Sequence, residues 1–307
     1  MGSDEPGMLL LKKACDHMQA FDVAEGMQQV YEGLRLTRES TDDPGWQHFI
    51  KEIAGGLGIV CYLHQDPFTR RSYTRPRGYP GDAELIDMVY GYGQLPRETS
   101  CLGAVIYAYM CQTPGARAAR RRRDVIAVEL KQLAVHTARP AVLAVACGHL
   151  RETRMLSEDM RAAFSEFAAL DQDRESLARA RSGCGIPALR AINVRVKDLV
   201  TGDITFSGLD FIYATGLYDY LPDQFAAALT ARLFGFLKPG GRLLLANFLP
   251  NLPDRLYLEA FMNWKLIYRS LPQIGRFADG IPDASIAERR LFCEDTELIG
   301  FLSLTRR

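Results

Sequence analysis

From about residue 137 onward, short apolar segments alternate with amphipathic ones, and this alternation constrains the fold more than any other feature of the sequence. Strands that alternate with helices form a parallel sheet covered on both faces. The segments predicted to form strands are Ala141–Ala146, Glu166–Leu170, Ala191–Val196, Asp210–Ala214 and Gly241–Phe248.

The last part of the chain follows a different pattern. Glu288–Cys293 and Leu298–Thr305 are separated only by a short acidic turn, so we expect them to pair as an antiparallel hairpin. The sequence therefore predicts an α/β fold over residues 137–307, with a Rossmann-like, mostly parallel sheet closed by an antiparallel C-terminal hairpin.

Residues 1–136 are predicted to form an N-terminal helical domain, a cap or substrate lid in front of the sheet. Apolar residues recur at helical spacing over Met8–Leu36 and Trp46–Leu63, although Gly55 and Gly56 weaken the second pattern. A loop rich in Arg, Tyr, Pro and Gly covers Arg70–Asp82. Further helices are predicted at Ala83–Tyr90, Ser100–Met110 and Arg117–Val135.

The composition gives no support to several classes of protein. Lys plus Arg equals Asp plus Glu at 37 each, so charge provides no general attraction to nucleic acid or to anionic membranes. No apolar run approaches the roughly 20 residues needed to span a bilayer. The seven cysteines are widely spaced and MGSDEP lacks the basic region of a signal peptide, which favours the cytoplasm. The sequence indicates no oligomeric state and no metal site.

Two motifs predict a ligand site at the carboxyl edge of the sheet. In AVLAVACGHLRE (Ala141–Glu152), a strand runs into Cys147 and Gly148, and a glycine lets the backbone approach a ligand closely. In AALDQDRESL, Asp171 ends the next strand and can accept hydrogen bonds from both hydroxyls of a ribose. Asp173 precedes a helical stretch and is the alternative for capping it.

Two later motifs continue the same edge. LDFIYATGLYDYLPD ends its strand at Thr215 and Gly216, followed by Tyr218 and Tyr220. In FLKPGGRLLLANF, Pro239–Gly241 is predicted to form a structural turn into a strand that carries Asn247 near its end, where Asn247 would face the substrate.

These motifs, together with MNWKLIYR and PRGYPGD, resemble the bacterial methyltransferase family of 3-hydroxypalmitic acid methyl ester biosynthesis, from about Tyr73 to the C-terminus. The resemblance implies a class I methyltransferase with S-adenosylmethionine (SAM) as methyl donor. It leaves the acceptor open, because relatives include methionine S-methyltransferases.

The resemblance also implies a set of donor-binding residues. Asp198 would hold the adenine amino group with Leu199 against the ring, although an ordinary loop aspartate is an equal alternative. The first strand has Ala144 and Ala146 where many relatives carry an acid, so Asp82 or backbone carbonyls near Ala146 would hold the donor's amino group. The predicted set is Ala146, Cys147, Gly148, Asp171, Gln172, Asp198, Leu199, Thr215 and Gly216.

The predicted substrate site begins in the Arg- and Tyr-rich loop, where an arginine can grip a carboxylate with two hydrogen bonds. A structural loop whose arginines pair with acids is the alternative, and Asp82 can equally cap the helix that begins at Ala83. The predicted set is Tyr73, Arg75, Arg77, Tyr79, Asp82, Tyr220, Asn247, Trp264 and Arg269, with Tyr73, Tyr79 and Tyr218 positioning the acceptor. Arg120–Arg123 is predicted to be a solvated helix surface.

The acceptor is predicted to be a small metabolite with a carboxylate, methylated without a general base. None of the five histidines lies in the ATGLYDY region, and thioethers and carboxylates need no deprotonation. S-methylation of a methionine-like thioether is preferred over esterification of a 3-hydroxy fatty acid. A non-catalytic SAM-binding module is the rival of another class, and a nucleic-acid methyltransferase is disfavoured because the Asn-Pro-Pro-Tyr type of sequence is missing.

Overall fold

The computed structural model describes residues 5–202 and 204–307 and divides the chain into two compact units. The helical unit contains the residues up to Arg117 together with Leu252–Lys265, and the sheet unit contains Ala118–Asn251 and Leu266–Arg307. This division differs from the boundary predicted at residue 136. Most of the long helix α8 (Pro114–His136) belongs to the sheet unit, and a short later segment returns to the helical unit.

The helical unit is built from short helices whose buried sides are apolar. Its elements are α1 (Pro6–Gln19), α2 (Val23–Glu39), α3 (Asp43–His48), a π-helical turn (Phe49–Ile53), a 3₁₀ turn (Ala54–Gly56), α4 (Val60–Leu63), α5 (Pro67–Thr74), α6 (Ala83–Tyr90), α7 (Cys101–Met110) and α13 (Arg255–Phe261). Asp66, Asp82 and Ser100 cap the helices that follow them with side-chain oxygens.

Two of the predicted long helical segments are interrupted in the structure. Met8–Leu36 is an antiparallel pair, α1 and α2, with the turn at Phe21, which has a left-handed φ of 60° and is 60% exposed. A Cβ added to Gly7 would lie 2.7 Å from the carbonyl oxygen of Gly33, so this glycine allows the two helices to pack closely. Trp46–Leu63 breaks at its two glycines, and the predicted loop from Arg70 is helical as far as Thr74.

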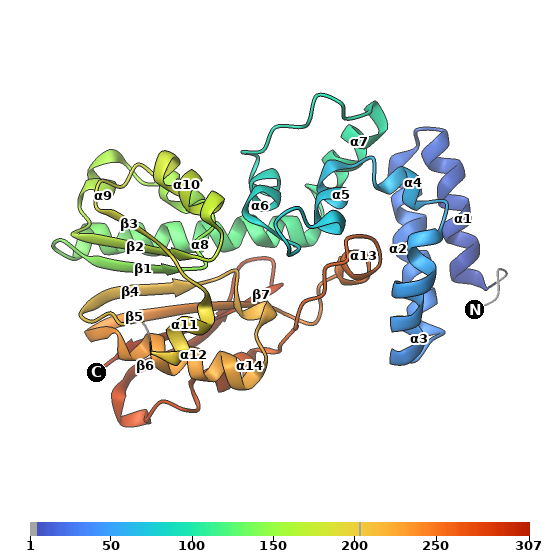
Figure 1. The fold of residues 1–307 in the computed structure, drawn as a ribbon. Helices are drawn as coiled ribbons and strands as arrows, with labels where there is room; N and C mark the ends of the chain where they lie inside the picture. The colour runs from blue at the N-terminus through green and yellow to red at the C-terminus, as the bar shows by residue number, and fades with distance from the viewer. Residues whose placement is uncertain (1–4, 203) are drawn as a thin grey trace. The chain divides into compact units, whose positions relative to one another are not determined.

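The sheet unit contains one seven-stranded sheet with the order β3-β2-β1-β4-β5-β7-β6 (Figure 1). The strands β1 to β5 are parallel, and β7 pairs antiparallel with both β5 and β6. The strands are β1 (Ala141–Val145), β2 (Glu166–Asp171), β3 (Leu189–Asn193), β4 (Leu209–Ala214), β5 (Leu237–Phe248), β6 (Ile286–Cys293) and β7 (Ile299–Arg306). The predicted parallel sheet with an antiparallel C-terminal hairpin is confirmed.

Helices cover both faces of this sheet. An apolar cluster with Leu143, Ile212 and Leu245 from the strands also includes Leu229 of α12 and Ile274 of α14. On the other face, the α8 side, Leu133 of α8 and Phe211 of β4 line one surface hollow. The helices within this unit are α9 (Glu158–Ala162), α10 (Arg174–Gly183), α11 (Val196–Thr201), α12 (Asp223–Gly235) and α14 (Leu271–Gly275), together with the larger part of α8.

Strand bounds depart from the prediction at β3 and β5. β3 begins and ends earlier than predicted, so Asp198 lies within α11 and not in a loop. β5 begins before Pro239–Gly241, which form an irregularity inside the strand where the pairing with β4 shifts register. A Cβ on Gly241 would lie 2.6 Å from the carbonyl oxygen of Leu209, so glycine is required where the two strands approach.

Among the described residues, every helix is too short or too polar to cross a membrane. All seven cysteines are free thiols. The cytoplasmic location stays a prediction.

Candidate functional site

The turn after β1 holds three residues in the left-handed region of backbone space. Ala146, Gly148 and Leu150 have φ values of 52°, 53° and 53°. Such conformations are costly for residues with a side chain and concentrate at ligand-binding turns. The backbone of this turn therefore has the character of a ligand-binding turn rather than that of an ordinary strand-to-helix connection.

Asp171 at the end of β2 ties this turn to its neighbouring strand. Its Oδ2 accepts a hydrogen bond from the Gly148 backbone N–H at 2.9 Å, and its Oδ1 accepts one from the Asp173 N–H at 2.9 Å. Asp173 in turn caps α10 by accepting from the Glu175 N–H. Burial raises the pKa of Asp171, while these two N–H groups oppose the rise. Because a carboxylate has about four acceptor positions, both oxygens retain capacity for a ligand hydroxyl.

Glu152 is an acid that the sequence analysis gave no role. It follows the left-handed turn, is 7% exposed, and accepts a hydrogen bond at 2.6 Å from the hydroxyl of Tyr213 in β4. Burial raises the pKa of Glu152, and the Tyr213 bond and nearby arginines lower it. The signal was the Glu that closes the GHLRE motif, which restores an acid after a first strand that lacks one.

The donor contacts predicted at Asp198, Leu199 and Gln172 are only partly supported. Asp198 forms a capping box with Arg195 at the start of α11 and pairs with its guanidinium at 3.3 Å, which favours the structural alternative. Leu199 is fully buried in the apolar cluster. The backbone carbonyl of Gln172 accepts from Asn193 Nδ2 at 2.9 Å, which holds Gln172 beside the end of β2, and its contact with the donor stays a prediction.

The end of β4 places Thr215 and Gly216 at the same edge, but the aromatic residues after them differ. Tyr218 is fully buried, and its hydroxyl forms a hydrogen bond with Thr230 at 2.9 Å, so its ring belongs to the core and the predicted positioning role is wrong. Tyr220 is 37% exposed and remains a candidate contact.

With this edge described, the chain can be compared with known proteins. A solved structure of a possible exported protein from Bordetella parapertussis is 17% identical, with a TM-score of 0.58, and the match covers 83% of this chain and 99% of that one. Magnesium protoporphyrin IX methyltransferase from Synechocystis PCC 6803, solved with bound S-adenosylhomocysteine (SAH), is 14% identical with a TM-score of 0.51, over 79% and 100% of the two chains. The chain has a methyltransferase fold. No protein-family model matches the sequence, and no curated protein matches it. The resemblance to the 3-hydroxypalmitic acid methyl ester family therefore stays a prediction.

In this methyltransferase fold, two residues predicted to face the substrate instead brace the loop after β4. Arg269 is 2% exposed, and its guanidinium donates to Asp223 Oδ1, to the backbone carbonyls of Tyr218 and Leu221, and to Asn247 Oδ1. Asn247 Nδ2 donates to the backbone carbonyls of Phe248 and Ile267. Because these donors are hydrogen-bonded to other protein groups, the substrate-binding predictions for Arg269 and Asn247 are wrong.

Asp219, like Arg269 and Asn247, helps to hold the loop after β4 in place. Its Oδ1 accepts from the Phe248 N–H at 2.7 Å. Burial raises the pKa of Asp219 to about 6, against the opposing attraction of Arg122 and the Phe248 hydrogen bond. It is the acidic residue of the ATGLYDY segment.

The arginine run on α8 is less uniform than predicted. Arg121 is exposed and pairs with Asp124 and Asp295, in agreement with a solvated surface. Arg122 is only 8% exposed, and its Cζ lies 5.8 Å from the centre of the Phe248 ring. The prediction of a solvated surface is wrong for Arg122, because successive residues of a helix point to different faces.

In the helical unit, the Arg- and Tyr-rich loop is internally bonded. Asp82 is 2% exposed, caps α6 through the Leu85 N–H, and receives three hydrogen bonds from Arg71. The capping alternative for Asp82 is thus the correct one, and its engaged oxygens do not favour a role with the donor's amino group.

The two predicted carboxylate anchors of this loop also have protein partners. Arg75 has a left-handed backbone at the end of α5 and donates to the Asn263 carbonyl, and Arg77 pairs with Glu84 at 3.5 Å. These contacts favour the alternative of a structural loop. Tyr73 packs against His64 with the two rings tilted by 51° and is 40% exposed, whereas Trp264 is 9% exposed. The substrate contacts of Tyr73, Tyr79 and Trp264 stay predictions.

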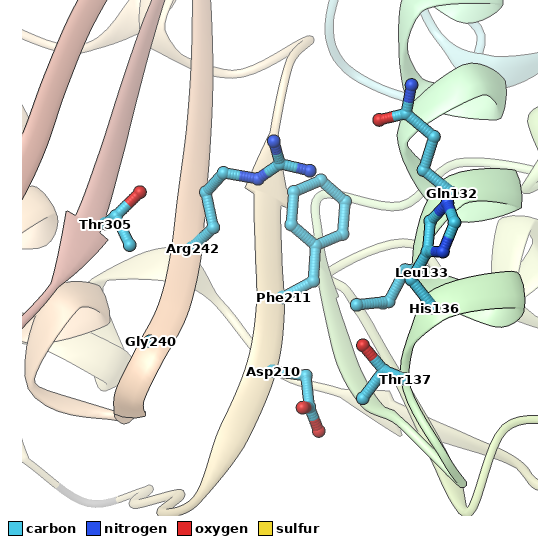
Figure 2. Close-up of a pocket in the computed structure, with 9 residues that line it drawn as sticks. All are labelled: Gln132, Leu133, His136, Thr137, Asp210, Phe211, Gly240, Arg242 and Thr305. Atoms are coloured by element: carbon cyan, nitrogen blue, oxygen red, sulfur yellow. The ribbon is translucent and has the colours of Figure 1, made fainter.

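A surface hollow of about 290 Å³ lies at the opposite, amino edge of the sheet (Figure 2). Figure 2 shows Asp210 and Phe211 at the start of β4 facing His136 and Thr137 at the end of α8. Asp210 pairs with Lys238, and Arg242 with Glu129. None of the predicted donor-binding residues lines this hollow, so it is separate from the candidate site.

Proposed function

We propose that this protein is a SAM-dependent methyltransferase that acts on a small carboxylate-bearing metabolite. One observation carries the proposal: the left-handed turn after β1 is hydrogen-bonded through Gly148 to the carboxylate that ends β2. In open α/β sheets, ligands bind beyond the carboxyl ends of the strands, and a strand-end carboxylate suits the hydroxyls of a ribose.

The residues at this edge fit a nucleoside donor. Gly148 has no side chain, so it allows close backbone approach, and Asp171 retains acceptor positions for two hydroxyls. Glu152 supplies the acid that the first strand lacks, so we assign it, in place of Asp82, to the donor's amino group. When bound, SAM would supply an activated methyl group.

The chain's own residues would act by orientation and exclusion of water. The turn and Asp171 would fix the donor, and the braced loop after β4 would hold Thr215 and Gly216 rigidly beside it. Alignment of the two reactants lowers the barrier without any proton transfer. The helical unit is proposed to serve as the substrate lid.

A methionine-like thioether is the proposed acceptor, because its lone pair attacks directly. The acidic residue of the ATGLYDY segment, Asp219, is 2% exposed and bonded to a backbone N–H, which suits a structural role better than that of a general base. Methyl esterification of a 3-hydroxy fatty acid needs no base either, and it is the competing outcome.

Calorimetry and mass spectrometry test the proposal in two steps. The intact protein should bind SAM and SAH, and absence of binding to both would reject it. Incubation with SAM and either L-methionine or 3-hydroxy acids of graded chain length should then yield a methylated product. A permanently charged sulfonium supports the thioether, and a base-labile ester supports the fatty acid. Binding without turnover of any metabolite from a cell extract would favour a non-catalytic SAM-binding module.

A further inference from the structure

Arg122 is a buried cation to which the structure assigns no hydrogen-bonding partner. Within the described part of the chain, its guanidinium takes part in no hydrogen bond and no salt bridge, although the residue is only 8% exposed. A guanidinium has five N–H donors, and one that is largely buried without an anionic partner is a candidate contact for an anionic ligand.

The surroundings of Arg122 place it at the candidate site. Its Nη2 lies 3.8 Å from where a Cβ on Gly216 would stand, at the end of β4, and its Cζ lies 5.8 Å from the ring of Phe248, at the end of β5. Since residue 216 has no side chain, nothing from that position covers the guanidinium.

Two carboxylates attract Arg122 without bonding to it. The charge of Arg122 lowers the pKa of both Asp219 and Glu152, against the effect of burial. Asp219 instead accepts from the Phe248 N–H, and Glu152 accepts from the Tyr213 hydroxyl. The charges of Asp219 and Glu152 therefore stabilise the buried guanidinium of Arg122. Its N–H groups stay available to a ligand, because neither acid accepts from them.

We propose that Arg122 binds the carboxylate of the methyl acceptor, in the role that the sequence analysis gave to Arg75 and Arg77. A guanidinium matches a carboxylate with two parallel hydrogen bonds. The sheet order β2-β1-β4-β5 puts Asp171, the proposed ribose contact, on one side of β1 and the Arg122 neighbours on the other. We therefore assign the carboxylate that Arg122 binds to the acceptor rather than to the amino-acid moiety of the donor, which carries the donor's own carboxylate. This inference rests on the proposed methyl transfer.

The test compares two thioethers that differ in the carboxylate, L-methionine and 3-methylthiopropylamine, as acceptors from SAM. The wild-type kcat/KM should be roughly 100-fold higher for L-methionine, which is what two charge-assisted hydrogen bonds provide. Arg122→Met should bring the ratio close to one by loss of activity with L-methionine alone. Arg122→Lys should keep part of the preference, and Arg121→Met, a neighbouring exposed position, should keep all of it.

Calorimetry with SAH and 5′-methylthioadenosine, which lacks the amino-acid moiety, checks that Arg122→Met is folded and identifies the source of the carboxylate. We expect both affinities within about threefold of wild type. A loss of roughly tenfold or more for SAH alone would assign the carboxylate to the donor and overturn the proposal. A ratio unchanged in Arg122→Met, or a wild type that binds SAH but does not prefer L-methionine, would also overturn it. Failure to bind SAM and SAH would instead reject the proposed function.

Discussion

The two units use buried carboxylates for different purposes. In the helical unit, acids tie distant segments together: Asp254 accepts from the Tyr31 hydroxyl, and Glu259 accepts from the indole N–H of Trp46. In the sheet unit, the interior beneath the strands is an apolar cluster, and buried acids such as Asp171 and Glu152 collect where strands end. Acids that lie at the carboxyl ends of the strands can be offered to a ligand, whereas acids that serve as internal ties cannot.

The largest expected effect is a loss of stability when apolar volume is removed from the core. For a residue of the sheet unit, this loss should be greater in the sheet unit than in the helical unit. Leu245→Ala, in the fully buried centre of β5, should lower the free energy of unfolding by about 3–4 kcal/mol. Both tryptophans, Trp46 and Trp264, lie in the helical unit, so fluorescence follows that unit and far-UV circular dichroism follows the whole chain. In urea, the dichroism transition should shift more than the fluorescence transition.

The control for this variant is Leu291→Ala, at a position 41% exposed in β6, which should change either transition by less than about 0.5 kcal/mol. Equal shifts of both signals in Leu245→Ala would contradict the separation of the two units.

A pH effect of roughly 3 kcal/mol should distinguish the buried acids of the two units. Burial raises the pKa of Asp66 from 3.8 to about 6, despite hydrogen bonds from Thr69 and Phe68. Because the folded state holds this proton more tightly than the unfolded state, the contribution is complete below about pH 4 and is lost as pH rises through 6. Asp66→Asn should remove this decline from a fluorescence-monitored unfolding series between pH 4 and 7.

Asp219→Asn is the matched variant in the sheet unit, since burial also raises the pKa of Asp219 to about 6. It should flatten the pH dependence seen by dichroism and leave the fluorescence profile unchanged. A fluorescence profile for Asp66→Asn identical to wild type would show that Asp66 does not titrate as described.

If the carboxyl edge of the sheet binds the donor, substitution of Asp171 should lower the affinity for SAH. Asp171→Ala should weaken SAH binding by roughly 100-fold, since it removes the acceptor of the ribose hydroxyls and the tie to Gly148. Asp173→Ala removes the cap of α10 and the acceptor of the Ser176 hydroxyl but keeps the backbone N–H that donates to Asp171, so it should cost about 1 kcal/mol of stability while SAH affinity stays within about threefold of wild type. Equal losses of affinity would mean that Asp171 acts only through the structure of the turn.

The smallest expected effect concerns the ties of the helical unit. Arg71→Ala leaves the buried carboxylate of Asp82 without its cation and should cost about 2 kcal/mol, measured by fluorescence in urea. The exposed pair of Arg190 with Glu166 in the sheet unit provides the contrast, and Arg190→Ala should cost less than about 0.5 kcal/mol. If both variants lost the same stability, the internal ties would be worth no more than surface pairs.

The sequence predicted the sheet unit far better than the helical one, for a physical reason. Strand periodicity and turn glycines are local signals, so β1, β4 and the hairpin followed directly from them. The two-helix pair at Phe21 was missed because amphipathic spacing continues across a short turn.

The missed site residues depend on tertiary placement. Arg122 reads as one of four consecutive arginines, and its burial follows only from the face of α8 on which it lies. Asn247 was predicted as a substrate contact because a polar side chain near a strand end looks the same whether it meets a ligand or a loop carbonyl. For Arg269, the sequence carries no local sign of the loop carbonyls to which it donates.

The later segment of the helical unit has a consequence for synthesis of the chain. Trp46, Thr69 and Ser72 each bond to residues of Leu252–Lys265, across sequence separations of 213, 188 and 190 positions. On the ribosome, the first 117 residues therefore emerge long before these partners and wait while most of the sheet is translated. The N-terminal helices consequently cannot be expressed as an intact fragment by cutting the gene at their end. An excised version would need Leu252–Lys265 spliced back onto it.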